Sequence, residues 1–176
     1  MHIQFLPEAA ALAIEPAPWR AMISITNPGE AASLRDGWGA LLRVQFADAS
    51  YDETTIHSYG RMWKLSSRGF FDKRQAIIIR GFIIGLSDSI SQFYVHCSAG
   101  VSRSAAVARY AADYFGVPLE QIHDRLNTTV LALLHDPDRY DAVLAAYQPP
   151  PSWWQNYGGG PHREHARTGE AARPRR

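Results

Sequence analysis

Residues 92–104 read Gln92-Phe93-Tyr94-Val95-His96-Cys97-Ser98-Ala99-Gly100-Val101-Ser102-Arg103-Ser104, and they are the most informative part of this 176-residue chain. The first five are mostly aromatic, β-branched or apolar, which is typical of a buried strand. Residues 103–115 are rich in alanine, with apolar side chains at helical spacing, and Gly116 and Pro118 provide a stop. The sequence therefore predicts a strand, a short loop and a helix in direct succession, within an α/β fold.

The loop in this unit has the features of an anion-binding site. Its backbone N–H groups can turn inward, and the N-terminus of the following helix adds roughly half a positive charge. Gly100 allows a backbone path that a side chain would hinder, and Arg103 can hold two oxygens of one anion with its planar guanidinium. Cys97 is expected at the base of this loop, where such a field lowers the pKa of a thiol below its usual value of about 8.5. A nucleophile and an anion site are thus predicted in one place.

The run from His96 to Ser104 resembles the His-Cys-x5-Arg-Ser/Thr motif of the cysteine-dependent protein tyrosine phosphatase superfamily. Its Ser-Ala-Gly-Val interior is similar to tyrosine-specific members, and Ser102-Arg103-Ser104 is similar to the compact dual-specificity branch. Upstream, residues 22–28 and 41–48 also resemble small bacterial tyrosine-phosphatase-like proteins, in which a strand delivers an acid before the catalytic loop. The resemblance implies a dual-specificity-phosphatase-like fold with a Cys-x5-Arg phosphate-binding loop between strand and helix.

The resemblance also implies a covalent mechanism without a metal or cofactor. Cys97 would attack phosphorus, Ser104 would stabilise the departing thiolate, and His96 would orient the loop. Phosphate would be bound by Arg103 and by the loop backbone at Ser98, Ala99, Gly100, Val101, Ser102 and Arg103. The implied activity is hydrolysis of phosphate monoesters, most readily phosphotyrosine on a protein or a small aryl phosphate.

The family protonates the leaving oxygen with an aspartic acid, and three candidates precede Cys97. Asp48 is preferred because it follows an apolar strand at the end where ligand sites gather in open α/β sheets. Asp52 on the same loop is the second choice, and Asp72 has the position of a helix N-terminal residue. The 48 residues between Asp48 and Cys97 exceed the usual family separation. Residues 49–70 therefore look inserted, with Tyr51, His57, Tyr59, Trp63 and Arg68 available for a pocket wall or lid.

Further strands and helices complete a central, mainly parallel sheet flanked by helices. Strands are predicted at 2–6, 22–26, 41–46 and 92–96. Helices are predicted at 71–86, with a strand at 77–79 as the alternative, and at 103–115, 118–126, 129–135 and 136–146. Arg125 and Asn127 lie either beside the site or on a polar helix surface.

The amino-acid composition predicts how the chain is divided and which kinds of partner are disfavoured. Residues 1–147 are predicted to form the phosphatase domain. Residues 148–176, rich in Pro, Gly and Arg, are predicted to form a flexible, functionally dispensable tail, with docking of Trp153 and Trp154 on the body or on a partner as the alternative. The 18 basic and 17 acidic side chains do not favour a nucleic-acid or membrane partner. A single cysteine excludes an internal disulfide, and no targeting segment is seen, so a cytoplasmic location is expected.

Two other functions remain open from the sequence. A sulfurtransferase of the rhodanese type also uses a cysteine in an anion-binding loop, although the Arg and Ser that follow here fit phosphoryl transfer better. A catalytically weak phosphoprotein-binding module of the same fold is the second alternative. Intact Cys97 and Arg103 favour an enzyme over such a module.

Overall fold

The computed structural model describes residues 1–121 and 124–147. These residues form an α/β fold around a four-stranded sheet with the strand order β1-β4-β2-β3, in which every pairing is parallel. The strands are β1 (His2–Pro7), β2 (Arg20–Thr26), β3 (Ala40–Gln45) and β4 (Gln92–Cys97). The predicted α/β class with a parallel central sheet is confirmed, as are all four predicted strands, with strand ends that differ by at most two residues.

Burial explains why the two central strands are rich in apolar residues that do not alternate with exposed polar ones. After their first residue, β2 and β4 are buried throughout, whereas the edge strands β1 and β3 are partly exposed. Parallel sheets are covered on both faces, so their inner strands lack the alternation of a half-exposed strand. Ile23 and Ile25 of β2 and Phe93 and Val95 of β4 are fully buried.

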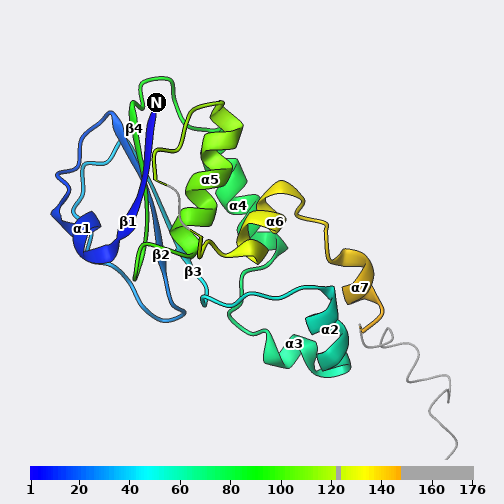
Figure 1. Ribbon diagram of the computed structural model, residues 1–176. Helices are drawn as coiled ribbons and strands as arrows, with labels where there is room; N and C mark the ends of the chain where they lie inside the picture. The colour runs from blue at the N-terminus through cyan, green and yellow to red at the C-terminus, as the bar shows by residue number, and fades with distance from the viewer. Residues whose placement is uncertain (122–123, 148–176) are drawn as a thin grey trace, which may run out of the picture.

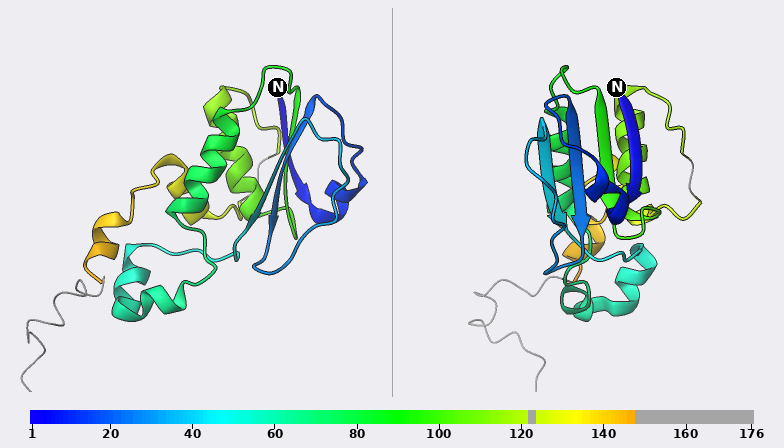
Figure 2. Two further views of the ribbon diagram at one scale, coloured as in Figure 1. Left: turned by 180° about the vertical axis from the view of Figure 1, so that it is seen from behind. Right: turned by 90° about the vertical axis from the view of Figure 1, so that its left-hand side faces the viewer.

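The two faces of the sheet are covered by different numbers of helices. Three of them, α4 (Lys73–Ile84), α5 (Arg103–Phe115) and α6 (Thr128–His135), lie on one face, where the main core forms. The other face carries α1 (Glu8–Ala13) and the loop 27–39, over a smaller core around Met22 and Tyr94 (Figures 1 and 2). The carboxyl ends of all four strands meet at one edge, the usual place for a ligand site.

The predicted helices over 103–115 and 129–135 are confirmed, and the left-handed Gly116 (φ +64°) ends α5 as expected. The long apolar segment 71–86 is also helical. Its helix begins after Asp72, whose carboxylate accepts hydrogen bonds from the backbone of Arg74 and Gln75. The strand alternative at 77–79 is wrong, because residues at helical spacing, such as Ile79 and Ile83, point into the core.

One helix prediction is wrong, and another is wrong in where the helix begins. None of the described residues among 118–126 is helical, since this loop crosses the edge strand and Gln121 Oε1 accepts the Phe5 backbone N–H at 3.1 Å; residues 122–123 lie outside the described chain. The helix expected from 136 to 146 begins only at Asp141. Residues 137–140 form turns instead, in which the Asp136 side chain accepts the Asp138 N–H and the Asp136 carbonyl accepts the Arg139 N–H.

Residues 49–70, which the sequence marked as an insertion, contain helices that it did not predict. These are α2 (Glu53–Tyr59), the 3-10 turn η1 (Gly60–Met62) and α3 (Trp63–Ser66). Together with α7 (Asp141–Ala145) they project beyond the carboxyl edge of the sheet, below α6 in Figure 1. The sequence also missed α1. The predicted tail, residues 148–176 with Trp153 and Trp154, lies outside the described residues.

Candidate active site

Cys97 and Arg103 bracket a loop of five residues at the carboxyl edge of the sheet. Cys97 is the last residue of β4, and Arg103 is the first of α5. Gly100 takes a positive φ of +72°, and a Cβ there would lie 2.2 Å from the backbone N of Pro7. The loop can therefore pack against the end of β1 only because this residue has no side chain. Backbone contact continues where the Glu8 N–H donates to the Ser98 carbonyl at 3.3 Å.

The Cys97 thiol is buried, with 2% of its surface exposed, and it is surrounded by hydrogen-bond donors. Its Sγ lies 3.2 Å from the Ser104 hydroxyl. Burial alone would raise the pKa of the thiol, but hydrogen bonds from the Ser104 hydroxyl and from the backbone N–H groups of Ser104, Gly100 and Ser102 together lower this pKa below its ordinary value. The site thus favours a thiolate nucleophile.

The Arg103 guanidinium is fixed by hydrogen bonds from Nη1 and by a longer one, at 3.4 Å, from Nη2 to the Ser98 hydroxyl. Its Nη1 donates to the Phe46 carbonyl at 2.6 Å and to Asn27 Oδ1 at 3.0 Å, both at the ends of neighbouring strands. The residue is only 3% exposed, yet its Nε has no hydrogen-bond partner within the described residues. A buried, unpaired guanidinium N–H is costly, so this geometry suits a bound anion that would accept from it.

Asp48 lies at the same edge, directly beside the loop. Its Oδ1 accepts hydrogen bonds from the Ser102 hydroxyl at 2.7 Å and from Asn127 Nδ2 at 2.9 Å, while its Oδ2 is 4.0 Å from Arg103 Nε. Its side chain is 40% exposed, compared with 4% for Arg103. The carboxyl group is therefore fixed through one oxygen, and its other oxygen remains available next to the guanidinium.

The two alternative carboxylates have other positions. Asp52 caps α2, where its side chain accepts from the backbone N–H of Thr55 at 2.8 Å and from the Thr55 hydroxyl at 2.7 Å. These backbone and side-chain hydrogen bonds hold the pKa of Asp52 below its usual range. Asp72 caps α4 in the same manner. No hydrogen bond joins either carboxylate to the Cys97 loop among the described residues, so Asp48 is the candidate that the fold brings to this loop.

Asn127 connects Asp48, the Cys97 loop and the start of α6. It is one of the two residues whose position the sequence left open. Its Oδ1 accepts the Val130 N–H and thereby caps α6, which leaves Nδ2 to donate to Asp48 and to the Ala49 carbonyl. Its own backbone N–H donates to the Ser102 carbonyl at 3.2 Å. Arg125, the other residue left open, lies in the turn before α6. An N-cap asparagine before an apolar helix was the available signal for the capping role.

His96 occupies a structural position behind the nucleophile. The ring is fully buried, and its Nε2 lies 2.8 Å from the Ser24 hydroxyl on the neighbouring strand β2. Burial, and secondarily the positive charge of Arg43, lowers the pKa of His96 to about 4. The imidazole is therefore neutral at physiological pH, and it joins β4 to β2 just before the loop begins.

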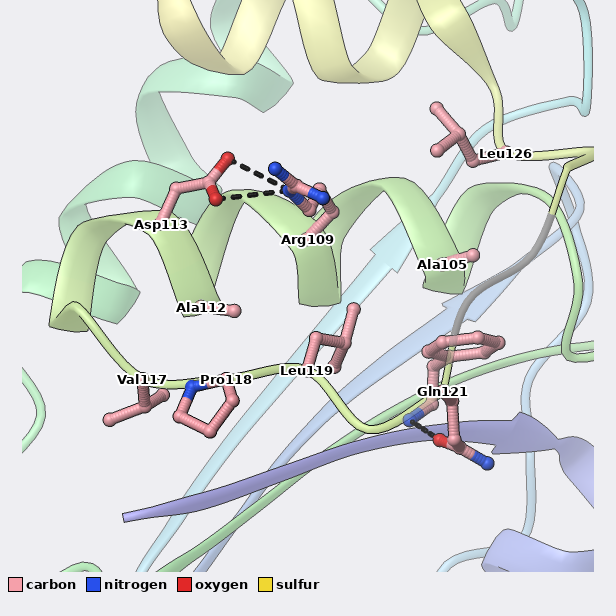
Figure 3. A pocket seen from close by; sticks show the side chains of 10 residues that line it. Ala105, Arg109, Ala112, Asp113, Val117, Pro118, Leu119, Gln121 and Leu126 are labelled. Atoms are coloured by element: carbon pink, nitrogen blue, oxygen red, sulfur yellow. Dashed lines mark hydrogen bonds and ion pairs between the residues drawn. The ribbon is translucent and has the colours of Figure 1, made fainter.

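Cys97 does not line either of two cavities found in the described part of the chain. One of about 250 Å³ is formed between α5 and the loop 117–121, where the Arg109–Asp113 ion pair and the Gln121 side chain appear in Figure 3. Another of about 440 Å³ lies against α3 and α7. Within residues 1–121 and 124–147, no three His, Cys, Asp or Glu side chains gather as metal ligands, and no helix combines the length and apolarity needed to cross a membrane.

Comparisons of the chain with protein-family models, with curated proteins and with solved structures found no match. The case for a function therefore depends on the geometry of the site.

The contribution of Ser104 to the thiolate gives a testable pH effect. Ser104→Ala removes a hydrogen-bond donor to Sγ, so the pKa of Cys97 should rise and the thiolate should appear only at higher pH. Because Cys97 is the only cysteine, ultraviolet absorbance of the thiolate against pH measures this directly. Ser98→Ala is the matched control, since no hydrogen bond joins its hydroxyl to Sγ. An unchanged midpoint in Ser104→Ala would contradict the assigned contact.

Proposed function

We propose that this protein is a cysteine-dependent phosphatase that hydrolyses phosphate monoesters, with phosphotyrosine on a protein as the favoured substrate. The observation that carries the proposal is the pairing of a buried thiol of lowered pKa with a buried guanidinium whose Nε lacks a partner within the described residues. Phosphoryl transfer through a covalent intermediate needs a nucleophile together with a cationic hydrogen-bond donor for the phosphoryl oxygens. The dual-specificity-phosphatase-like fold expected from the Cys-x5-Arg motif is part of this proposal.

The proposed reaction has two displacements. In the first, the Cys97 thiolate attacks phosphorus, a sulfur–phosphorus bond forms, and the bond to the ester oxygen breaks while Asp48 donates a proton to that oxygen. In the second, Asp48 takes a proton from water, the water oxygen attacks phosphorus, and the thiolate leaves with stabilisation from Ser104. Arg103 and the backbone N–H groups of the loop would hold the equatorial oxygens in both steps.

The deciding experiment is an assay of the purified protein with a chromogenic aryl phosphate and, in parallel, with thiosulfate and cyanide. Release of phosphate supports the proposal. Sulfur transfer without phosphatase activity would replace it with the rhodanese-type function, and binding of a phosphotyrosine peptide with no turnover would indicate the phosphoprotein-binding module.

The acid role of Asp48 predicts an effect that depends on the leaving group. Asp48→Asn keeps an Oδ1 that can accept from Ser102 and Asn127 but removes the proton donor. The rate on phosphotyrosine, a poor leaving group, should fall on the order of 10²- to 10⁴-fold, and much less on an ester whose oxygen departs unprotonated. Asp52→Asn and Asp72→Asn are the controls. If one of these loses the rate on phosphotyrosine instead, the acid is a different carboxyl group.

A further inference from the structure

Basic side chains are concentrated in one part of the protein. Residues 61–74 contain five basic side chains and one acidic side chain, while the remainder of residues 1–147 contains eight basic and fourteen acidic ones. The positive segment is the end of the insertion together with the first turn of α4. An otherwise acidic body therefore presents one strongly basic region, which would attract a negatively charged partner.

Two of these cations, Lys64 and Arg68, line the cavity of about 440 Å³. Its walls are largely aromatic and aliphatic, formed by Trp63 and Phe70, whose ring centroids are 6.2 Å apart, with Leu144 and Tyr147. Neither Lys64 nor Arg68 has a carboxylate within ion-pair distance in the described part of the chain, whereas Lys73 is paired with both Asp138 and Asp141. The cavity thus offers unneutralised positive charge above an apolar wall.

Asp72 is the acidic residue at this cavity. Its carboxylate accepts the backbone N–H groups of Arg74 and Gln75 as the cap of α4. Asp72 is thus engaged by the helix end and is not paired with Lys64 or Arg68. The charge available to a ligand at this cavity is positive.

Hydrogen bonds connect the cavity to the segment of chain that leads to the candidate active site. Two of its lining residues bond to the chain just before Asp48: the Gly69 carbonyl accepts the Ala47 N–H at 2.7 Å, and Gln75 Nε2 donates to the Gln45 carbonyl at 2.9 Å. Asp48 then contacts the Cys97 loop through Ser102. An extended peptide advances about 3.3–3.6 Å per residue, so residues that flank a side chain bound at the loop can extend toward this cavity.

From these observations we infer that the cavity lined by Trp63, Lys64, Arg68 and Phe70 binds an acidic side chain that flanks the phosphorylated tyrosine of a peptide substrate. The carboxylate pairs with Lys64 and Arg68, and the methylene stem packs on the aromatic wall. The inference rests on the proposed function for its substrate, and it adds a preference for acidic sequence. A glutamate suits the cavity because it combines an apolar stem with a terminal charge.

The test compares two phosphotyrosine peptides of equal length, with either glutamates or glutamines on both sides of the phosphotyrosine. Both kcat/KM in the wild-type protein and equilibrium binding to Cys97→Ser are measured. The glutamate peptide should be favoured about three- to tenfold, the gain expected from two partly exposed ion pairs. Lys64→Ala/Arg68→Ala should remove this preference, chiefly through KM, and Lys64→Glu/Arg68→Glu should reverse it.

Arg35→Ala/Arg109→Ala is the matched control, because it removes the same charge from two exposed arginines that pair with Glu15 and Asp113. It should keep the preference, and raised salt should weaken the preference in the wild-type protein. Equal behaviour of the two peptides, or a preference that survives in Lys64→Ala/Arg68→Ala, would overturn the inference. Turnover of a small aryl phosphate reports separately on the proposed function, and binding to Cys97→Ser tests the cavity even if that turnover is absent.

Discussion

Cys97→Ser is expected to abolish turnover of aryl phosphates while leaving phosphate-ester binding largely intact. A serine hydroxyl is far less ionised than a thiol whose pKa the loop already lowers, so the covalent step cannot begin. A loss on the order of 10⁴-fold or more in kcat is expected for removal of a nucleophile. The backbone N–H groups and Arg103 remain, so a fluorescent phosphotyrosine peptide should still bind. A rapid denaturing quench of the wild-type protein during turnover should also reveal phosphate on Cys97 by mass spectrometry.

Ser98→Ala provides the control for this variant. It removes a hydroxyl whose hydrogen bond from Arg103 Nη2 is long, at 3.4 Å, and keeps the backbone N–H that the mechanism uses. Ser98 is also exposed, so folding and most of the activity should be retained. Full activity in Cys97→Ser would contradict the covalent mechanism altogether. If Cys97→Ser stayed folded but lost phosphopeptide binding as well as turnover, the thiol would be needed to bind the anion, and a role as nucleophile would not follow.

Local sequence signals predict the strand–loop–helix unit around Cys97 well, because the determinants lie within a few residues of one another. Strand β4 is buried along its length, Gly100 is required by the approach to Pro7, and Gly116 ends α5 in the left-handed conformation. The preference for Asp48 also came from a local pattern, a carboxylate just after an apolar strand. Its contact with Ser102 agrees with that placement.

Other features depend on partners distant in sequence, which a single chain does not reveal. Asn127 reaches Asp48 across 79 positions, and the charge of Arg43 on β3 acts on His96 of β4, although β2 lies between these two strands. The helix expected at 118–126 fails because Gln121 instead binds the backbone of β1 across 116 positions. A weak local helix pattern thus loses to a tertiary hydrogen bond, as propensity generally does when packing opposes it.

After Cys97, Arg103 should be the position where substitution lowers activity most, because its guanidinium both binds the anion and donates hydrogen bonds within the protein. Arg103→Ala removes a charged N–H donor from the oxyanion site, for which losses on the order of 10²- to 10³-fold in kcat are typical of a single donor, and it should also weaken ground-state binding. The variant leaves the Phe46 carbonyl and Asn27 Oδ1 without their donor. A fall in thermal stability is therefore expected for Arg103→Ala. This variant alone would combine the loss of anion binding with the loss of stability.

Arg103→Lys separates the two effects. Lysine keeps the positive charge but cannot donate to Phe46 and Asn27 on one side while presenting a second N–H to an anion on the other, since it lacks the planar fork. Activity should still fall by at least about 10²-fold, and inhibition by vanadate, a tetrahedral phosphate mimic, should weaken, while thermal stability stays closer to that of the wild-type protein. Arg109→Lys, six residues further along α5 and paired with Asp113, should change neither quantity. If Arg103→Lys retained near-normal turnover and vanadate inhibition, positive charge alone would suffice at this position, and the uncommitted Nε would lose its assigned part in binding the phosphoryl group.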